Sequence, residues 1–128
     1  MNFFAGEYLF YEHEHPDEIY FILRGKVKLM YDLMEGLIKT TYMIPFNMYV
    51  EGSYFGDSDV LGDWDNEGRD GTALVDAQSN LFVVTRQDLM SILNKKAFKE
   101  KVAKEMMTIA RERRLHHKEA IEELKLQN

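Results

Sequence analysis

Hydrophobic and polar residues follow two different patterns along this 128-residue chain. From Glu7 to about Arg86, short apolar runs alternate with Gly, Asp and Pro, whereas from about Gln87 onward the chain has neither Gly nor Pro and is rich in helix formers. Short apolar runs between turn residues are typical of strands, and a long segment without breakers is typical of helices. The pattern therefore predicts a β-rich part followed by helices.

The β-rich part divides into short segments. Arg24-Gly25 and Glu35-Gly36 interrupt it, and we expect Gly25 at a tight hairpin turn that needs a positive φ. About seven or eight strands with turns every eight to twelve residues favour a roll or barrel over alternating strands and helices. The predicted strands include Ile19–Leu23, a segment with Val27, Leu29 and Tyr31 on one face, Leu37–Ile44, Met48–Phe55, Ala73–Val75 and Leu81–Thr85.

Two helices are predicted after the strands. The first begins at Arg86-Gln87-Asp88, and the second has an apolar stripe at three- or four-residue spacing that ends at Arg113. We expect this long helix to lie across the roll, and the Lys/Glu-rich stretch around Ile121 and Leu124 to project into solvent or to meet a partner. The predicted fold is mainly β with α: an antiparallel β-roll over about 4–86, a short helix inside it, and C-terminal helices over about 87–127, all in one domain.

Composition narrows the class of protein. The chain is 45% hydrophobic, has no cysteine, and carries 16 basic and 22 acidic residues for a net charge of −6. These values exclude a disordered chain and a disulfide-stapled secreted module, and they make nucleic acid an unlikely partner. No apolar run approaches the ~18–20 residues that cross a bilayer, and no signal peptide opens the chain. We therefore expect a soluble, intracellular single domain without direct membrane insertion.

Candidate binding chemistry lies in Glu51-Gly-Ser-Tyr-Phe-Gly-Asp57 and in Arg69 further along. Asp57 and Ser58 are placed to open a short helix beside Gly56, where backbone N–H groups are accessible to an anion. An arginine that folds back onto this turn supplies a bidentate charge for a phosphate, and a nearby carboxylate accepts hydrogen bonds from sugar hydroxyls. This arrangement suits one small ligand with a phosphate and a ribose. The spacing alone is a weak signal, because a GxxxG pattern with a distant arginine is more often two turns and a surface residue.

The chain resembles a cyclic-nucleotide-binding domain, most of all those at the cytoplasmic C-terminal end of tetrameric cation channels. Three motifs in order support the resemblance: Gly6-Glu7-Tyr8 followed by Ile19-Tyr-Phe-Ile-Leu-Arg-Gly25, then Gly52-Ser-Tyr-Phe-Gly-Asp57, then Arg69-x-x-Thr72 running into the Arg86–Leu93 helix. The resemblance covers most of the chain, from about Phe4 to the first half of the long helix.

The resemblance implies that residues 55–73 form a phosphate-binding cassette, the name used for this segment below. Arg69 would pair with the cyclic phosphate, with Thr72 nearby. Asp57 would accept a hydrogen bond from the ribose 2′-hydroxyl, in a position where the family normally has glutamate. Gly56 and the amides that follow it would face ribose and phosphate.

The long helix would complete the site. Arg111, or Arg113 or Arg114 in another register, would cover the base, and the ligand would draw the helix in and so favour its docked state. The expected ligand-contacting residues are Phe55, Gly56, Asp57, Ser58, Asp59, Arg69, Asp70, Thr72 and Arg111, with no metal and no other cofactor. The implied function is a ligand-sensing regulatory domain that binds cAMP or cGMP and acts on a gated ion channel, such as a potassium channel.

Departures from the family pattern leave two alternatives open. Asp57 is one methylene shorter than glutamate, Asp70 stands where channel relatives often have Thr, and an acidic insertion, Gly62–Gly68, lengthens the connection to Arg69. Like charges near a cyclic phosphate weaken its binding. The first alternative is therefore the same fold with a degenerate, nucleotide-free cassette that acts as an interaction or gating module. The second is the regulatory domain of a cyclic-nucleotide-dependent kinase.

Other site chemistries have weaker support. Asp63-x-Asp65-x-Glu67-Gly68 begins like a calcium loop, but Leu74 occupies the position of the bidentate glutamate. His13 and His15 lack a third ligand for zinc, and the adjacent His116 and His117 cannot face one ion together.

No catalytic set is recognisable, so we do not expect an enzyme. We expect no DNA-reading helix-turn-helix of the kind found in bacterial transcription regulators, because only a short Lys/Glu-rich stretch follows the apolar stripe of the long helix. We expect a domain excised from a longer polypeptide, monomeric in isolation and tetrameric in a channel parent.

Overall fold

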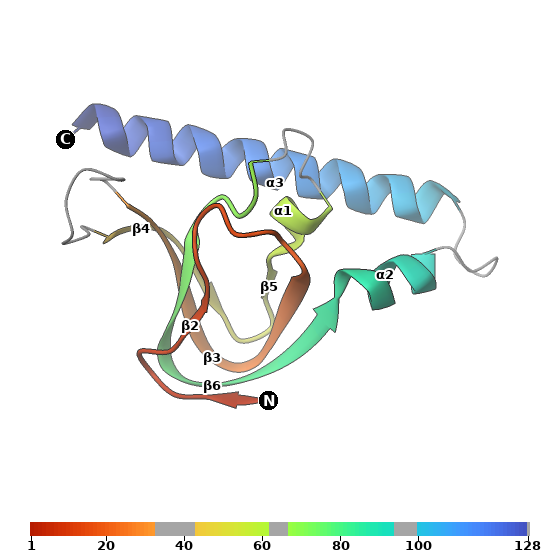
Figure 1. Ribbon diagram of the computed structural model, residues 1–128, viewed down its shortest axis with the longest axis horizontal. Coiled ribbons are helices and arrows are strands. Elements are labelled where there is room, and N and C mark those ends of the chain that lie inside the picture. The colour runs from red at the N-terminus through yellow and green to blue at the C-terminus, as the bar shows by residue number, and fades with distance from the viewer. Residues whose placement is uncertain (33–42, 62–66, 94–99, 128) are drawn as a thin grey trace.

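The computed structural model describes residues 1–32, 43–61, 67–93 and 100–127. Within them the strands come first, with the short helix α1 between β5 and β6, and the helices α2 and α3 come last, in the predicted order (Figure 1). They are β1 (Asn2–Phe3), β2 (Tyr8–Phe10), β3 (Glu18–Asp32), β4 (Met43–Val50), β5 (Tyr54–Phe55), α1 (Asp57–Val60), β6 (Thr72–Thr85), α2 (Arg86–Leu93) and α3 (Glu100–Gln127).

Two long antiparallel strands organise the sheet. β3 and β6 pair almost from end to end, from Glu18 opposite Thr85 to Met30 opposite Thr72. β5 and β4 add to successive parts of β3, while β1 and β2 add to β6. The strands curve into a roll, and α3 runs across its open side (Figure 1). The predicted antiparallel β-roll with a short inner helix and two C-terminal helices is therefore confirmed.

The expectation of a hairpin at Gly25 is wrong. Gly25 lies inside β3, where the pairing with β6 shifts register on both sides of it. Its φ is +112°, and a Cβ atom there would collide with the side chain of Ser79 on β6. Glycine is needed for a bulge and a close approach of two strands, and the strand continues through it.

The other strand boundaries also differ from the prediction. The segments expected at 73–75 and 81–85 are one continuous strand, β6, and the segment expected over 48–55 is divided between β4 and β5 by a turn at Glu51-Gly52. The expected strand over 37–44 is described only from Met43, where β4 begins. Its first part, the Glu35-Gly36 break, residues 63–65 of the acidic insertion and the first turn expected for the long helix lie outside the described residues.

The core of the roll is aromatic and aliphatic. Phe55 is fully buried at its centre, and its ring stacks on Tyr20 at 5.2 Å and on Tyr49 at 5.4 Å between centroids. Burial of rings of this size is a main source of stability in a small domain. Other buried members of the cluster are Phe10, Ile22, Val27, Leu29, Ala73, Val75 and Leu81.

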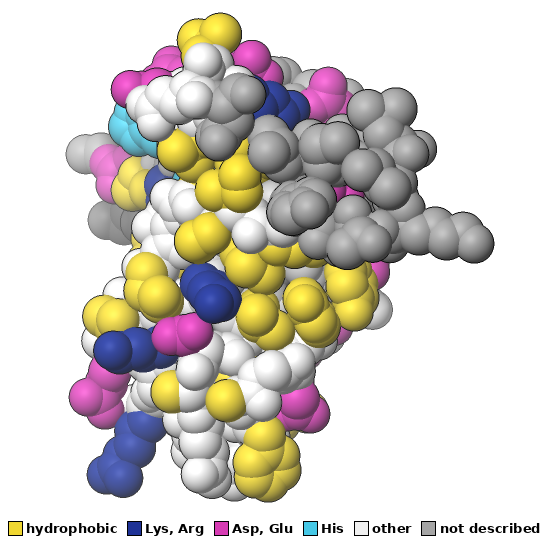
Figure 2. All heavy atoms as spheres, turned by 90° about the vertical axis from the view of Figure 1, so that its left-hand side faces the viewer, with side chains coloured by type: hydrophobic (Ala, Val, Ile, Leu, Met, Phe, Trp, Pro, Cys, Tyr) yellow, Lys and Arg dark blue, Asp and Glu magenta, His cyan; other side chains and the backbone are white. Residues whose placement is uncertain are grey.

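The surface shown in Figure 2 mixes side-chain types. Acidic and basic side chains are interspersed there among hydrophobic ones, and basic side chains do not gather into a continuous stripe. Among the described helices, none is long and apolar enough to span a membrane.

Candidate functional site

The turn that opens the cassette depends on a glycine. Gly56 has a φ of +91° and precedes the single helical turn α1. A Cβ atom at this position would lie 2.9 Å from the carbonyl oxygen of Glu18 and 3.0 Å from Nη1 of Arg69. Glycine therefore allows the cassette backbone, the start of β3 and the arginine to approach one another.

Arg69 lies inside this turn. Its side chain is 3% exposed; Nη2 donates to the Glu18 carbonyl at 2.8 Å, and Nη1 donates to the Gly56 carbonyl at 3.4 Å. The guanidinium carbon lies 3.9 Å from the centroid of the Phe10 ring. The arginine expected to meet a phosphate is thus fixed in position by contacts with β2, β3 and the head of α1.

Asp57 contacts the long helix. Its Oδ1 accepts a hydrogen bond from Nη1 of Arg113 at 2.7 Å, and Nη2 of the same arginine donates to the Tyr54 carbonyl at 2.9 Å. The guanidinium also lies over the rings of Tyr54 and Tyr49. Burial raises the pKa of the Asp57 carboxyl above its ordinary value, against the lowering effect of Arg113.

A second contact joins Asp70 to His117 of α3. Nδ1 of His117 donates to Oδ2 of Asp70 at 2.8 Å, and Ser58 Oγ donates to the same oxygen at 3.3 Å. The other ring nitrogen of His117 is 3.0 Å from the Tyr49 hydroxyl. Burial alone would raise the pKa of Asp70, but the hydrogen bond and electrostatic interaction with His117, together with the charge of Arg114, hold that pKa below its ordinary value.

Two further contacts continue along the same side of α3. Arg114 is fully buried and donates to the Gly68 carbonyl at 2.9 Å, while Lys118 forms an ion pair with Glu67. Arg111, the residue expected to cover the base, is exposed instead. The helical register turns Arg113 and Arg114 toward the cassette, which corresponds to the other registers that the sequence left open.

The remaining predicted site residues have structural partners. Thr72 Oγ1 accepts from the Glu12 amide at 2.9 Å, and Phe55 belongs to the core. The side chain of Asp59 lies outside what the structure describes. No cluster of metal-ligating side chains occurs in the described residues, and Asp63 and Asp65 of the calcium-like motif are not among them.

Sequence patterns did not predict that Tyr49 and His117 take part in the contacts between α3 and the cassette, or that Arg114 faces the cassette. A signal for His117 was present, because it follows Arg113 by four residues and so extends the stripe of the long helix by one turn. The apolar stripe ends at Arg113, and the next members at the same spacing are polar. Polar side chains continue the packed face here because the surface that they meet, the cassette, is itself polar.

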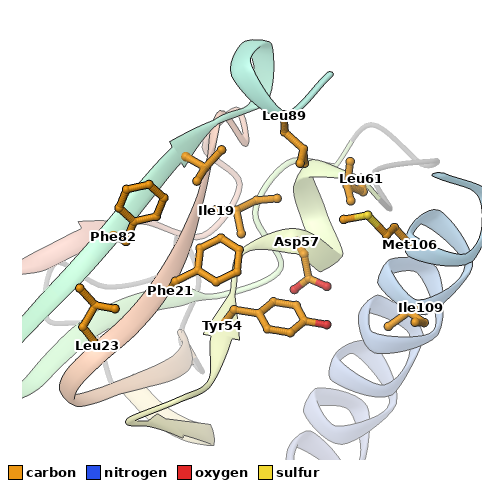
Figure 3. A pocket seen from close by; sticks show the side chains of 11 residues that line it. Ile19, Phe21, Leu23, Tyr54, Asp57, Leu61, Phe82, Leu89, Met106 and Ile109 are labelled. Atoms are coloured by element: carbon orange, nitrogen blue, oxygen red, sulfur yellow. The ribbon is translucent and has the colours of Figure 1, made fainter. Parts of the chain in front are cut away.

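Two cavities adjoin these contacts. The larger, about 700 Å³, is lined by apolar side chains of β3, β6, α2 and α3 together with Tyr54, Asp57 and Leu61 (Figure 3). Among its described lining residues none is basic, so it does not suit a phosphate. The smaller, about 380 Å³, is lined by both basic and acidic side chains: Arg69, Arg114, Lys118 and Lys125 are basic, and Glu12, Glu67, Asp70 and Glu122 are acidic. The groups suited to a phosphate therefore lie on the side of Arg69.

Comparison with known proteins decides the family. The family model described as "Cyclic nucleotide-binding domain" matches residues 1–96 of this chain. The chain belongs to the cyclic nucleotide-binding domain family. No curated protein matches it.

Solved structures support the same fold. The EAL enzyme Bd1971 in its cAMP-bound form has a TM-score of 0.66 and 23% identity, over 100% of this chain and 32% of that one. The regulatory domain of Toxoplasma gondii PKA with cAMP has a TM-score of 0.60 and 16% identity, over 82% and 37%. The N-terminal domain of a transcriptional regulator from Streptomyces coelicolor A3(2) has a TM-score of 0.62 and 23% identity, over 91% and 74%. The chain thus spans about a third of the length of Bd1971.

Proposed function

We propose that this domain is a regulatory module that responds to cAMP or cGMP at its cassette and passes the response on through α3. The observation that carries the proposal is the direct attachment of α3 to the cassette: Arg113 binds Asp57, and His117 binds Asp70. Because these cassette residues are the ones that the family resemblance assigns to the ligand, a change at the cassette alters the forces on α3. Ligand and helix are therefore thermodynamically linked.

The placement of Arg69 supports a phosphate as part of the ligand. Its guanidinium is held against two carbonyls and an aromatic ring, so it is ordered before any ligand arrives. A fixed arginine loses less conformational entropy on binding an anion than a mobile surface arginine. It lies beside Gly56, the residue that precedes α1.

The effector that α3 acts on is a separate part of the proposal. A gated cation channel, expected from the motifs, would place the domain on the cytoplasmic side of a membrane protein. A kinase regulatory domain is the other candidate, and structures similar to this chain include the regulatory domain of Toxoplasma gondii PKA. In either case α3 is the segment through which the effector would sense the cassette.

A second function is favoured by a specific observation. Asp57, Ser58, Asp70 and Thr72 all have hydrogen-bond partners within the chain. These four side chains therefore do not need a nucleotide to satisfy their hydrogen bonds. The second candidate is therefore a gating or interaction module that keeps α3 docked and binds no nucleotide.

Calorimetric titration with cAMP and cGMP separates the two functions. We expect binding to the wild type that weakens at least about tenfold in Arg69→Lys, because lysine keeps the charge but loses the planar fork that meets several oxygens at once. Arg24→Lys, at an exposed position on β3, is the matched control and should bind as the wild type does. The absence of heat at millimolar nucleotide, both in the wild type and in the α3 variants described next, would exclude the nucleotide sensor and leave the second function.

A further inference from the structure

The C-terminal half of α3, residues 111–125, uses the groups that the family resemblance assigns to the ligand. Oδ1 of Asp57 is bound to Arg113 at 2.7 Å, and Oδ2 of Asp70 is bound to His117 at 2.8 Å. Ser58 Oγ lies 3.4 Å from the same imidazole. A nucleotide that hydrogen-bonds to these oxygens therefore competes with bonds that α3 already makes.

The imidazole of His117 also takes up space at the cassette. Its side chain is 8% exposed and its ring meets the Phe46 ring edge to face, with centroids 5.5 Å apart. The Tyr49 hydroxyl and the Asn47 amide approach its Nε2 at 3.0 and 3.4 Å. The His117 ring thus has an aromatic neighbour and hydrogen-bonding neighbours, the two kinds of contact that line small-molecule sites.

Charge strengthens this docking. α3 directs Arg113, Arg114 and Lys118 toward a cassette that contributes Asp57, Asp70 and Glu67. A ribose offers neutral hydroxyl donors to the carboxylates, whereas α3 offers the charged guanidinium of Arg113 to Asp57. Because a hydrogen bond between two ionised groups is stronger than one with a single ionised partner, the helix is a strong competitor at this position.

We propose that the C-terminal half of α3 is a tethered competitor of the nucleotide, so that ligand binding releases this half of the helix. This inference rests on the proposed nucleotide-binding function and reverses the expected sign of coupling, in which the ligand favours the docked helix. If α3 is docked about 99% of the time, the apparent affinity for nucleotide falls about a hundredfold. An interaction that stabilises the docked helix then weakens nucleotide binding, and nucleotide binding weakens that interaction by the same factor.

The first test removes the competing side chains. In calorimetric titration with cAMP and with cGMP, His117→Ala and Arg113→Ala should each bind at least about tenfold more tightly than the wild type. His116→Ala and Lys104→Ala change exposed residues of the same helix and should bind as the wild type does. Circular dichroism melting shows whether each variant is folded before it is titrated.

The second test uses the unmodified chain and so does not depend on the folding of any variant. Hydrogen–deuterium exchange of the amides in 111–125 is measured with and without saturating nucleotide. Release of the helix predicts faster exchange when nucleotide is bound, by at least about tenfold. Slower exchange would mean that the nucleotide holds the helix in place, and the competition would be refuted.

The outcomes separate this inference from the proposed function. Binding to the wild type that stays equal or weakens in folded His117→Ala and Arg113→Ala overturns the competitor while the nucleotide sensor stands. Binding in the two variants but not in the wild type supports both. No binding in any of the three proteins removes the nucleotide function, and the competition falls with it.

Discussion

The core of the β-roll and the interface between α3 and the cassette are held together by different forces. In the core, Phe55 and its neighbours are apolar and their contacts are non-directional. At the interface the contacts are ion pairs and hydrogen bonds, such as Arg113 with Asp57 and His117 with Asp70. The apolar side chains of the core have no favourable partner in water, whereas each polar group at the interface can form a hydrogen bond with water instead.

This difference suits the core to a rigid scaffold and the interface to a contact that can open and close. A scaffold must keep its shape whether or not a signal is present, and apolar burial provides this because exposure of the same surface is always unfavourable. A relay must have two states of similar free energy, and polar groups provide this because water or a ligand can replace the helix as their partner. The following variants test whether the two regions differ in this way.

The largest effect is expected in the core. Phe55→Ala removes a fully buried ring and leaves a cavity, so the free energy of unfolding should fall by about 3–5 kcal/mol, with little dependence on salt. Phe82→Ala removes a ring that is 59% exposed and should cost less than about 1 kcal/mol. Urea denaturation measures both variants. Similar losses for the two would mean that the roll is not stabilised mainly by this cluster.

The next effect is expected at the buried pair. Asp70→Asn keeps the size of the side chain but removes the charge that faces His117, which should cost about 3 kcal/mol near neutral pH. Asp76→Asn, at an exposed residue paired with Lys28, is the control and should cost less than about 1 kcal/mol.

The same variant also predicts a pH dependence. Because the pKa of Asp70 is lower in the folded state, its ionised form stabilises the fold above the ordinary value, and this contribution is lost as the pH falls through the lowered pKa. The difference in unfolding free energy between wild type and Asp70→Asn should therefore shrink below pH about 4. A difference that stays constant down to pH about 2 would contradict the role of the charge.

The smallest effect is expected at the partly exposed pair. The Arg113 side chain is 22% exposed, so Arg113→Ala should lower the free energy of unfolding by about 1–2 kcal/mol. The loss should become smaller at 1 M salt, which screens the pair. Arg111→Ala, two residues earlier and exposed, should have almost no effect. Equal effects of the two substitutions would show that the contact with Asp57 contributes no stability.

Local patterns along the chain were enough to predict the kind and order of the elements. Alternation around Val27, Leu29 and Tyr31 identified a strand, and the helical propensity after Gln87 identified α2 and most of α3. They did not predict that β3 continues through Gly25, because a glycine with a positive φ fits both a hairpin turn and a bulge. The choice depends on Ser79, which approaches from β6 and is far away in sequence.

For the candidate site, the sequence predicted which cassette residues lie together better than it predicted their contacts. Gly56, Asp57, Arg69 and Asp70 do lie together, as the order of the three motifs indicated. The sequence could not show that Arg69 turns inward to backbone carbonyls. It also could not show which arginine of α3 faces the cassette, since a rotation of the helix by one residue changes its contacts by about 100°.

The amino-acid sequence by itself determined the kind and order of the secondary-structure elements and the resemblance to a family, because these follow from periodicity, turn residues and short motifs that are local in the chain. Only the tertiary structure decided which partners the cassette residues have. Asp57 meets Arg113 across 56 residues and Asp70 meets His117 across 47, and such pairs depend on how the helix rests on the roll. Directional contacts between distant segments are fixed by packing, and packing is a property of the folded chain.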